Sequence, residues 1–293
     1  MVVAGDVDPA PLRAAGWSLR GVLSVDPYVD RLDAATYVDP SEVCDDPEVD
    51  AVALDGAERE LAALLPELRA SGLLLLLPTA DPQDVELVRA ARAVPEAADA
   101  CVGLLRRFEP WTTTVAAAVP LAGAPPVQLT VRGWPRGRQA AAELVDLASA
   151  WCGAVVAVVA APAVLPAAEL SGDAAVSWAL LTDSGATVLV SHGGGPEQVR
   201  LSFPTARLLA GADRVRWEGG AELLLPPSER GGPDRPDPRA VACAAALTRA
   251  VGGGDVATQR WPWPADLGDL LVVSRVLEAL RTSASTERLV PVA

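Results

Sequence analysis

Five consecutive leucines, bounded by Gly72 and Pro78, constrain the fold of this chain more than any other stretch. The run carries no polar side chain, so it does not suit a strand with one face in water. A short apolar run that ends at a turn residue is typical of a strand covered on both faces, as in the centre of a parallel sheet. Helical patterns flank it at Glu58–Ser71 and Pro82–Val94. The sequence therefore predicts a buried strand between two helices.

The same alternation of strand and helix continues over residues 1–119. Further strands are expected at Val2–Gly5, Gly21–Val25, Val49–Leu54 and Ala100–Leu105. Helices are expected at Pro11–Ala15 and Trp111–Val119, with a single helical turn at Ser41–Cys44. Such alternation predicts an α/β domain with a doubly wound parallel sheet. In that architecture ligands bind at the carboxyl ends of the strands.

From residue 120 onward the pattern changes to short strands separated by tight turns. Strands are expected at Val127–Arg132, Ala154–Ala161, Ala174–Leu181, Thr187–His192, Gln198–Phe203, Arg214–Glu218, Ala221–Leu225 and Arg288–Val292. Helices are expected at Gln139–Trp151, Arg239–Val251 and Asp266–Thr282. Hairpin turns favour a largely antiparallel sheet. We therefore expect residues 120–293 to form a second domain, an α+β unit with an open sheet.

The charge balance excludes two classes of partner. The chain of 293 residues has a net charge of −14, which would repel nucleic acids and anionic membranes. All 24 basic residues are arginine, and lysine, asparagine and isoleucine are absent, as expected for a GC-rich bacterial genome. The absence of lysine also removes one residue type that enzymes use as an acid, a base or a Schiff-base nucleophile.

The cysteines and the termini point to a reducing compartment. The four cysteines are scattered at positions 44, 101, 152 and 243, with no CxxC motif and no neighbouring histidine, so neither a disulfide framework nor a metal site is predicted. Met1–Asp6 has no basic stretch and no apolar region of a signal peptide. The longest near-apolar run, Gly153–Leu165, is too short to span a bilayer. We expect a soluble, cytoplasmic protein.

Four segments, in this order and spacing, resemble the Gfo/Idh/MocA oxidoreductases, the glucose-fructose oxidoreductase and inositol dehydrogenase family. They are Asp46–Val52 before the third strand, Val102–Pro110 with its Arg-Phe-x-Pro, Val145–Leu147 with Trp151–Gly153, and Arg275–Val292. The resemblance implies a Rossmann-like first domain that binds NAD(P). It also implies a second domain whose sheet mediates contact between subunits.

The dinucleotide loop of that family departs from its pattern here. The family pattern is G-x-G-x-x-G/A, in which glycines let the backbone approach the pyrophosphate. The matching residues begin at Gly5 and end at Ala10, and both are compatible with the pattern. Val7 stands where a side chain would block the phosphate, and Asp6 and Asp8 add negative charge beside it. The resemblance thus assigns Gly5 and Ala10 to a degenerate cofactor loop.

Asp26 follows the second strand at the position where the family holds the ribose with an acidic residue. An Asp-Pro turn after any strand would give the same match, and we favour that interpretation. The family's catalytic lysine, aspartate and histidine are also absent. Their positions correspond to Leu76–Pro78, Gln139 and Glu143. The single histidine, His192, ends an expected strand and suits a hairpin better than proton transfer.

Two pairs of charged residues remain as candidates. Glu143 and Asp146 lie three residues apart on one helix and are either an acid/base pair or part of a solvated helix face, which we favour. Arg106 and Arg107 follow a strand and either bind an anionic ligand or form salt bridges with carboxylates, which we favour. The segment Trp261–Pro264 suits a partner contact or an intramolecular clasp.

Two hypotheses for function follow from these observations. In the first, the protein has lost redox catalysis, binds no dinucleotide and acts as a ligand-binding or scaffold subunit. It would then associate with itself or with a related subunit through the second sheet. In the second, it is an NAD(P)-dependent oxidoreductase or a non-redox enzyme that acts on a small polar, sugar-like substrate with unusual residues. The missing lysine, the missing histidine and Val7 favour the first.

Overall fold

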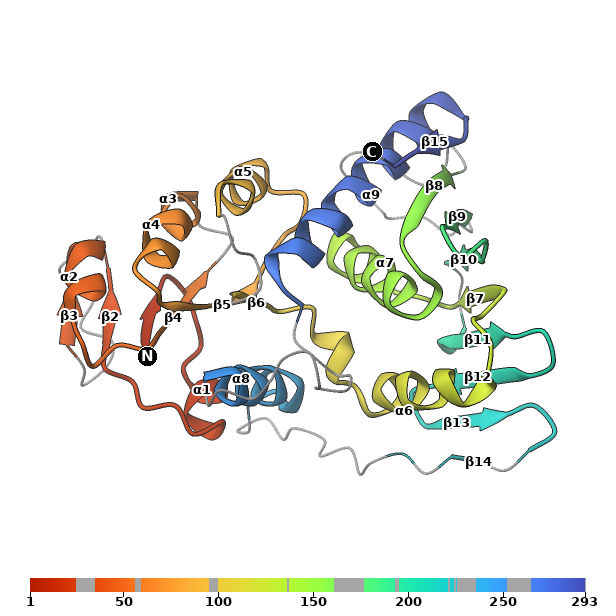
Figure 1. Cartoon of the computed structure of the whole chain (residues 1–293), viewed down its shortest axis with the longest axis horizontal. Helices are drawn as coiled ribbons and strands as arrows, with labels where there is room; N and C mark the ends of the chain where they lie inside the picture. Colours follow the sequence, from red (N-terminus) through yellow and green to blue (C-terminus); the bar gives the residue numbers. More distant parts are fainter. Residues whose placement is uncertain are drawn as a thin grey trace. The chain divides into compact units, whose positions relative to one another are not determined.

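The computed structural model describes residues 1–24, 35–55, 59–94, 100–135, 137–160, 177–192, 195–220, 222–223, 225, 236–251 and 265–292 (Figure 1). The chain divides into two compact units. Unit 1 comprises Met1–Leu105 and Glu229–Leu271, and unit 2 comprises Arg106–Ser228 and Val272–Ala293. These units differ from the ranges 1–119 and 120–293, because residues 106–119 belong to unit 2 and the chain after Ser228 contributes to both units.

Within the described residues, the sheet of unit 1 has six strands, all parallel, in the order β3-β2-β1-β4-β5-β6. Their bounds are Val2–Ala4 (β1), Gly21–Leu23 (β2), Ala35–Tyr37 (β3), Ala51–Asp55 (β4), Leu74–Thr79 (β5) and Ala100–Val102 (β6). The leucine run forms β5 between β4 and β6, and Leu75, Leu76 and Leu77 are buried. The predicted doubly wound sheet with the leucine strand in its interior is therefore confirmed.

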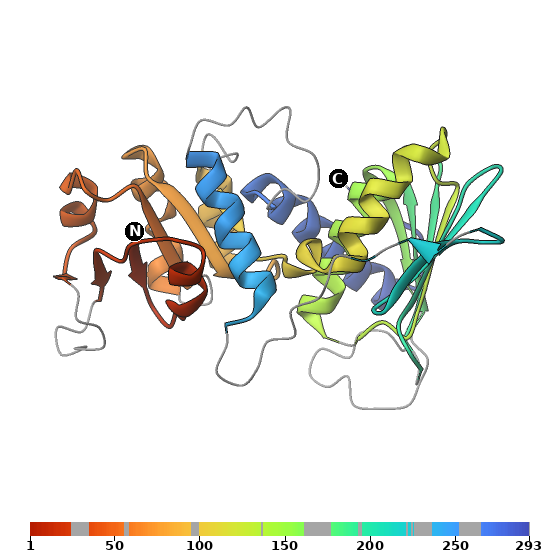
Figure 2. The same ribbon diagram turned by 90° about the horizontal axis from the view of Figure 1, so that it is seen from below.

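Helices cover both faces of this sheet (Figures 1 and 2). Their bounds are Ala10–Ala14 (α1), Pro40–Asp45 (α2), Arg59–Ala62 (α3), Leu65–Ala70 (α4), Val85–Ala93 (α5) and Pro238–Val251 (α8). Helices α1 and α8 pack together on one face, with α8 against β5, whereas α3, α4 and α5 pack together on the other. A late helix thus completes the first unit, which explains why unit 1 is discontinuous in sequence.

Two details of unit 1 differ from the sequence-based expectation. The helix expected at 58–71 is two short helices, because Pro66, which lacks an amide hydrogen, sits near the start of α4 and cannot continue α3. Strand β3 was not expected at all. It is a three-residue edge strand with two exposed residues, so it carries no apolar run that a pattern search could find.

In the part of unit 2 that the structure describes, the sheet has nine strands in the order β14-β13-β12-β11-β7-β10-β9-β8-β15, antiparallel except for the pair β7 and β10. Their bounds are Gln128–Arg132 (β7), Val155–Ala160 (β8), Ser177–Thr182 (β9), Thr187–Ser191 (β10), Gln198–Ser202 (β11), Arg207–Gly211 (β12), Arg214–Trp217 (β13), Glu222–Leu223 (β14) and Val290–Pro291 (β15). The largely antiparallel sheet is confirmed. Strand β12 was missed because it ends in the small residues Ala210 and Gly211.

The described helices of unit 2 lie on one face of this sheet (Figure 2). They are Pro110–Ala118 (α6), Arg138–Cys152 (α7) and the part of Leu267–Thr286 (α9) that belongs to the unit. Helix α6 packs on β12 and β13, α7 packs on β7, and Ser283 of α9 donates from its hydroxyl to Arg288 and accepts from the amide of Ala160. The inner face of the sheet is therefore buried.

The outer face of the same sheet exposes apolar side chains. Val156, Val159, Leu181 and Leu189 are each 39–40% exposed, whereas Val158 is fully buried. A register shift in the pairing of β8 with β9 falls between Val155 and Ala157, and it breaks the simple alternation of β8. Strands β8, β9 and β10 thus present an apolar stripe on the face that no described helix covers.

Candidate functional site

The loop between β1 and α1 occupies the position of a dinucleotide loop. Gly5 follows β1 with a φ of 77°, a left-handed conformation that glycine adopts readily. Helix α1 is only five residues long, and its N-cap Pro9 supplies no side-chain hydrogen bond. Instead, the Asp8 carboxylate accepts a hydrogen bond of 2.9 Å from the amide of Ala10. An amide of the first turn of α1 is therefore already bonded to a carboxylate of the chain itself.

The carboxyl end of β5 is in backbone contact with the chain that follows β6. The amide of Gly103 donates to the carbonyl of Leu77 over 2.7 Å. A side chain at Gly103 would place its Cβ 2.1 Å from the carbonyl oxygen of Pro78, so only glycine permits this approach. The strand end that carries a catalytic lysine in the resembling family is thus apolar and in direct backbone contact with its neighbour. Asp26 lies outside the described residues.

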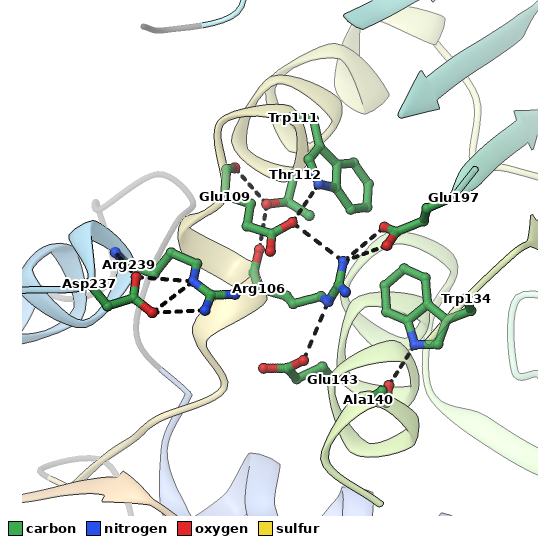
Figure 3. A network of polar contacts seen from close by, with 10 residues as sticks. All are labelled: Arg106, Glu109, Trp111, Thr112, Trp134, Ala140, Glu143, Glu197, Asp237 and Arg239. Atoms are coloured by element: carbon green, nitrogen blue, oxygen red, sulfur yellow. Dashed lines mark hydrogen bonds and ion pairs between the residues drawn. The ribbon is translucent and has the colours of Figure 1, made fainter. Parts of the chain in front are cut away.

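In unit 2, Arg106 is the centre of a network of polar contacts (Figure 3). Its Nη1 lies 2.8 and 2.9 Å from the two carboxylate oxygens of Glu197 and 3.4 Å from Glu109. Its Nε lies 3.4 Å from Glu143 of α7. One guanidinium group, with a side chain only 13% exposed, thus serves three carboxylates.

Two tryptophans support this arrangement (Figure 3). The guanidinium carbon of Arg106 lies 4.3 Å from the ring centroid of Trp134, a cation–π contact. The indole of Trp134 is fixed by its hydrogen bond of 2.7 Å to the carbonyl of Ala140. The indole of Trp111 donates to Glu109 over 2.6 Å. Burial raises the pKa of the Glu197 carboxyl, and the guanidinium of Arg106 opposes that rise.

Arg107 and Asp146 form a second, deeper ion pair. The Arg107 Nε donates to one oxygen of Asp146 over 2.7 Å, and its Nη2 contacts the other oxygen. The two residues are 5% and 3% exposed. Two parallel hydrogen bonds between a planar guanidinium and a carboxylate fix both groups in one geometry. This pair joins the chain after β6 to α7.

These contacts decide between the two interpretations of each charged pair. Glu143 and Asp146 are 9% and 3% exposed, so the solvated helix face is wrong. Both carboxylates lie on the side of α7 that faces Arg106 and Arg107, and both form ion pairs with these arginines. For the arginines, the interpretation as partners of nearby carboxylates is confirmed. A carboxylate held by a guanidinium is stabilised in its charged form and is a weaker base than one without such a partner.

His192 has a structural role. Its Nε2 accepts a hydrogen bond of 3.0 Å from the indole of Trp178, and its Nδ1 lies 3.1 Å from the carbonyl of Trp134. These partners require the neutral ring with its proton on Nδ1. The residue follows β10 and is buried. The expected position at a strand end is confirmed, but the expected hairpin is wrong, because β7 lies between β10 and β11 in the sheet.

Two of the described cysteines, Cys101 and Cys243, are buried with their sulfur atoms 3.4 Å apart, and Cys152 is buried elsewhere. Burial raises the pKa of the Cys152 thiol to about 12, so this cysteine does not form a nucleophilic thiolate near neutral pH. The residues with described positions include no group of three or more histidine, cysteine, aspartate or glutamate side chains that could hold a metal ion. Among the same residues, no helix has the length and apolarity to cross a membrane.

Sequence reasoning missed three members of the Arg106 network. Glu109 lies three residues after Arg106, and this spacing is a usable signal. Glu197 precedes β11, far from Arg106 in sequence, and Trp134 follows β7. Nothing in the local pattern of either residue indicates the contact, because strand pairing in the sheet creates it.

Comparison with known proteins supports the fold. No protein-family model matches the chain, and no curated protein matches it. Among solved structures, levoglucosan dehydrogenase in complex with NADH matches with a TM-score of 0.72 at 15% identity, over 100% of this chain and 98% of that one. A myo-inositol dehydrogenase from Corynebacterium glutamicum matches with 0.69 at 18%, also over 100% and 98%. The WlbA dehydrogenase from Bordetella pertussis, in complex with NADH and UDP-GlcNAcA, matches with 0.69 at 16% and the same coverage.

The chain therefore has the two-unit fold of NAD-binding oxidoreductases along its whole length. The resemblance to the Gfo/Idh/MocA oxidoreductases, first indicated by four short segments, is confirmed at the level of this fold.

Proposed function

We propose that this protein keeps the fold of an NAD-binding oxidoreductase but no longer catalyses hydride transfer. It acts instead as a ligand-binding or scaffold subunit in the cytoplasm. The observation that carries the proposal is the hydrogen bond from the Ala10 amide to the Asp8 carboxylate. A helix N-terminus binds phosphate through free amides and a favourable dipole. The Asp8 carboxylate occupies the Ala10 amide and places its own negative charge at the positive end of the dipole, so it competes with a phosphate.

The polar groups of unit 2 support the same proposal. An acid or base that serves a substrate needs a proton that it can exchange with that substrate. Glu143 and Asp146 are instead ion-paired with Arg106 and Arg107, and His192 is bonded on both ring nitrogens. Each titratable group near the family's catalytic positions therefore has a structural partner.

The outer face of the second sheet supports a role in assembly. Its apolar stripe consists of Val156, Val159, Leu181 and Leu189. Contiguous apolar surface on a sheet is characteristic of a protein contact. We propose that the protein associates through this stripe with a second copy of itself or with a related subunit.

The alternative is an active enzyme, either an NAD(P)-dependent oxidoreductase or a non-redox enzyme with carboxylate catalysts, acting on a small sugar-like substrate. Two structural neighbours that were solved in complex with NADH favour it. NADH binding is an established property of those two neighbours, and for this protein it is the alternative proposal.

A turnover assay separates the proposed loss of hydride transfer from an active NAD(P)-dependent oxidoreductase. Purified protein is incubated with NAD⁺ or NADP⁺ and a panel of inositols, monosaccharides and anhydrosugars, and the absorbance of reduced nicotinamide is followed. We expect rates equal to those without protein. Turnover that Asp146→Asn abolishes in a folded variant would support the enzyme and contradict the loss of catalysis.

A further inference from the structure

Four arginines lie on the outer face of the second sheet, beside the apolar stripe. Arg132 is on β7, Arg200 on β11, and Arg214 and Arg216 on β13. All four are exposed, and their strand neighbours Val131, Val199 and Val215 point into the buried face. The alternation of each strand therefore directs the four guanidinium groups to one side.

Strand register brings these arginines together. Arg200 pairs with Leu209 of β12, and Leu209 pairs with Arg216, so the two arginines flank one leucine. Arg132 pairs with Gln198, two residues before Arg200 on β11. Arg214 pairs with Gly211.

The four arginines line one cavity of about 330 Å³. Its floor includes Thr130, Leu209 and Gly211, which are small or apolar and leave room between the arginines. A Cβ added at Gly211 would lie 3.2 Å from the carbonyl oxygen of Glu197, tighter than most such contacts. A cavity of this volume suits a small ligand.

The protein balances the charges of this cavity only in part, through Asp213 in its lining and through Glu222, which lies opposite Arg216 on β14. Within the described part of the chain, none of the four arginines makes an ion pair or a side-chain hydrogen bond. Of the two acidic residues in the lining, Glu197 is bonded to Arg106, which leaves Asp213. The chain as a whole has a net charge of −14, so its other arginines have many carboxylates available. Four unpaired guanidinium groups around one cavity are therefore a local exception.

We propose that this cavity binds a compact anion that carries two or more phosphate or carboxylate groups. Guanidinium groups match the planar oxygen pairs of both, and four of them favour a ligand with several negative charges. The site lies on the face opposite α6 and α7, and it shares Glu197 with the Arg106 network. It goes beyond the proposed loss of catalysis and does not depend on it.

Calorimetric titration with pyrophosphate, and separately with citrate, tests the site in low-salt buffer. We expect saturable binding of one ligand per chain by at least one of the two, and weaker binding of orthophosphate. The preferred probe then identifies phosphate or carboxylate chemistry. Arg200→Gln and Arg216→Gln should each weaken binding about tenfold or more, as expected for the loss of charge-assisted hydrogen bonds.

Arg207→Gln is the matched control. Arg207 also lies on the second sheet, but it pairs with Glu218 over 3.0 Å and does not line the cavity. The Arg207→Gln substitution removes the same charge, and we expect it to change the dissociation constant of the probe less than twofold. All variants should unfold at the temperature of the parent protein. Absence of binding by both probes, or an equal loss in Arg207→Gln, would overturn the proposal. Neither titration contains a dinucleotide, so this site and the proposed function can fail separately.

Discussion

Replacing Arg107 with methionine is expected to destabilise the protein by about 3–5 kcal/mol, the usual cost of removing one partner of a buried ion pair. The substitution keeps the apolar length of the side chain but removes the guanidinium group. The Asp146 carboxylate, 3% exposed, then loses its principal cationic partner in a region with little access to water. Chemical denaturation followed by circular dichroism measures the loss.

Two further variants identify the cause. Arg89→Met removes an exposed arginine whose partner Glu86 is three residues away, and it should cost less than about 1 kcal/mol. The double variant Arg107→Met with Asp146→Leu removes both charges together. It should recover most of the lost stability, because an apolar pair of similar volume replaces a buried ion pair at little cost. A double variant no more stable than Arg107→Met would show that packing, rather than charge, causes the effect.

Val156→Arg is expected to dissociate the proposed assembly. Val156 is 40% exposed at the apolar stripe, and a charged side chain there would have to lose its hydration in a packed sheet interface. Light scattering behind size exclusion at micromolar concentration should give the parent protein at least twice its chain mass of 30.2 kDa, if it associates with itself. The variant should elute as a monomer with an unchanged unfolding temperature.

Val85→Arg is the control for this experiment. Val85 begins α5 in unit 1 and is 67% exposed, so the same substitution adds the same charge away from the stripe. It should leave the mass unchanged. If the parent protein is itself monomeric, self-association through this face is excluded, and only a related subunit remains as a partner.

The sequence predicts the fold well where side-chain pattern and burial coincide. The leucine run of β5 and the alternation of β7 are clear examples, since the covered faces determine both patterns. Strand β3 is lost because it is a short edge strand that buries little, whereas β12 lies inside its sheet but ends in the small residues Ala210 and Gly211. The order of elements along the sequence also does not show how the chain is divided between the two units. Helix α8 follows the second sheet in sequence but packs on α1 and β5.

The candidate site is less predictable than the fold. Local sequence identifies Arg106, Arg107, Glu143 and Asp146 as a set of charges, but not which of them pair. The pairing depends on which side of α7 faces the chain after β6. Glu197 reaches Arg106 because the sheet places the start of β11 next to it. Val7 in place of a loop glycine and the added charge of Asp8 are both visible in the sequence. The hydrogen bond between Asp8 and Ala10 is a property of the loop conformation, which the sequence alone does not define.

The central claim is that the inherited cofactor site no longer binds a dinucleotide, and thermal unfolding with NAD(H) and NADP(H) tests it most directly. A ligand present at one hundred times its dissociation constant stabilises a protein by about 2.7 kcal/mol, which raises the unfolding temperature by several degrees. We expect no concentration-dependent rise with millimolar concentrations of any of the four nucleotides. A saturating rise of about 5 °C or more with one of them would contradict the account, and the loop from Gly5 to Ala10 would then be a working cofactor site.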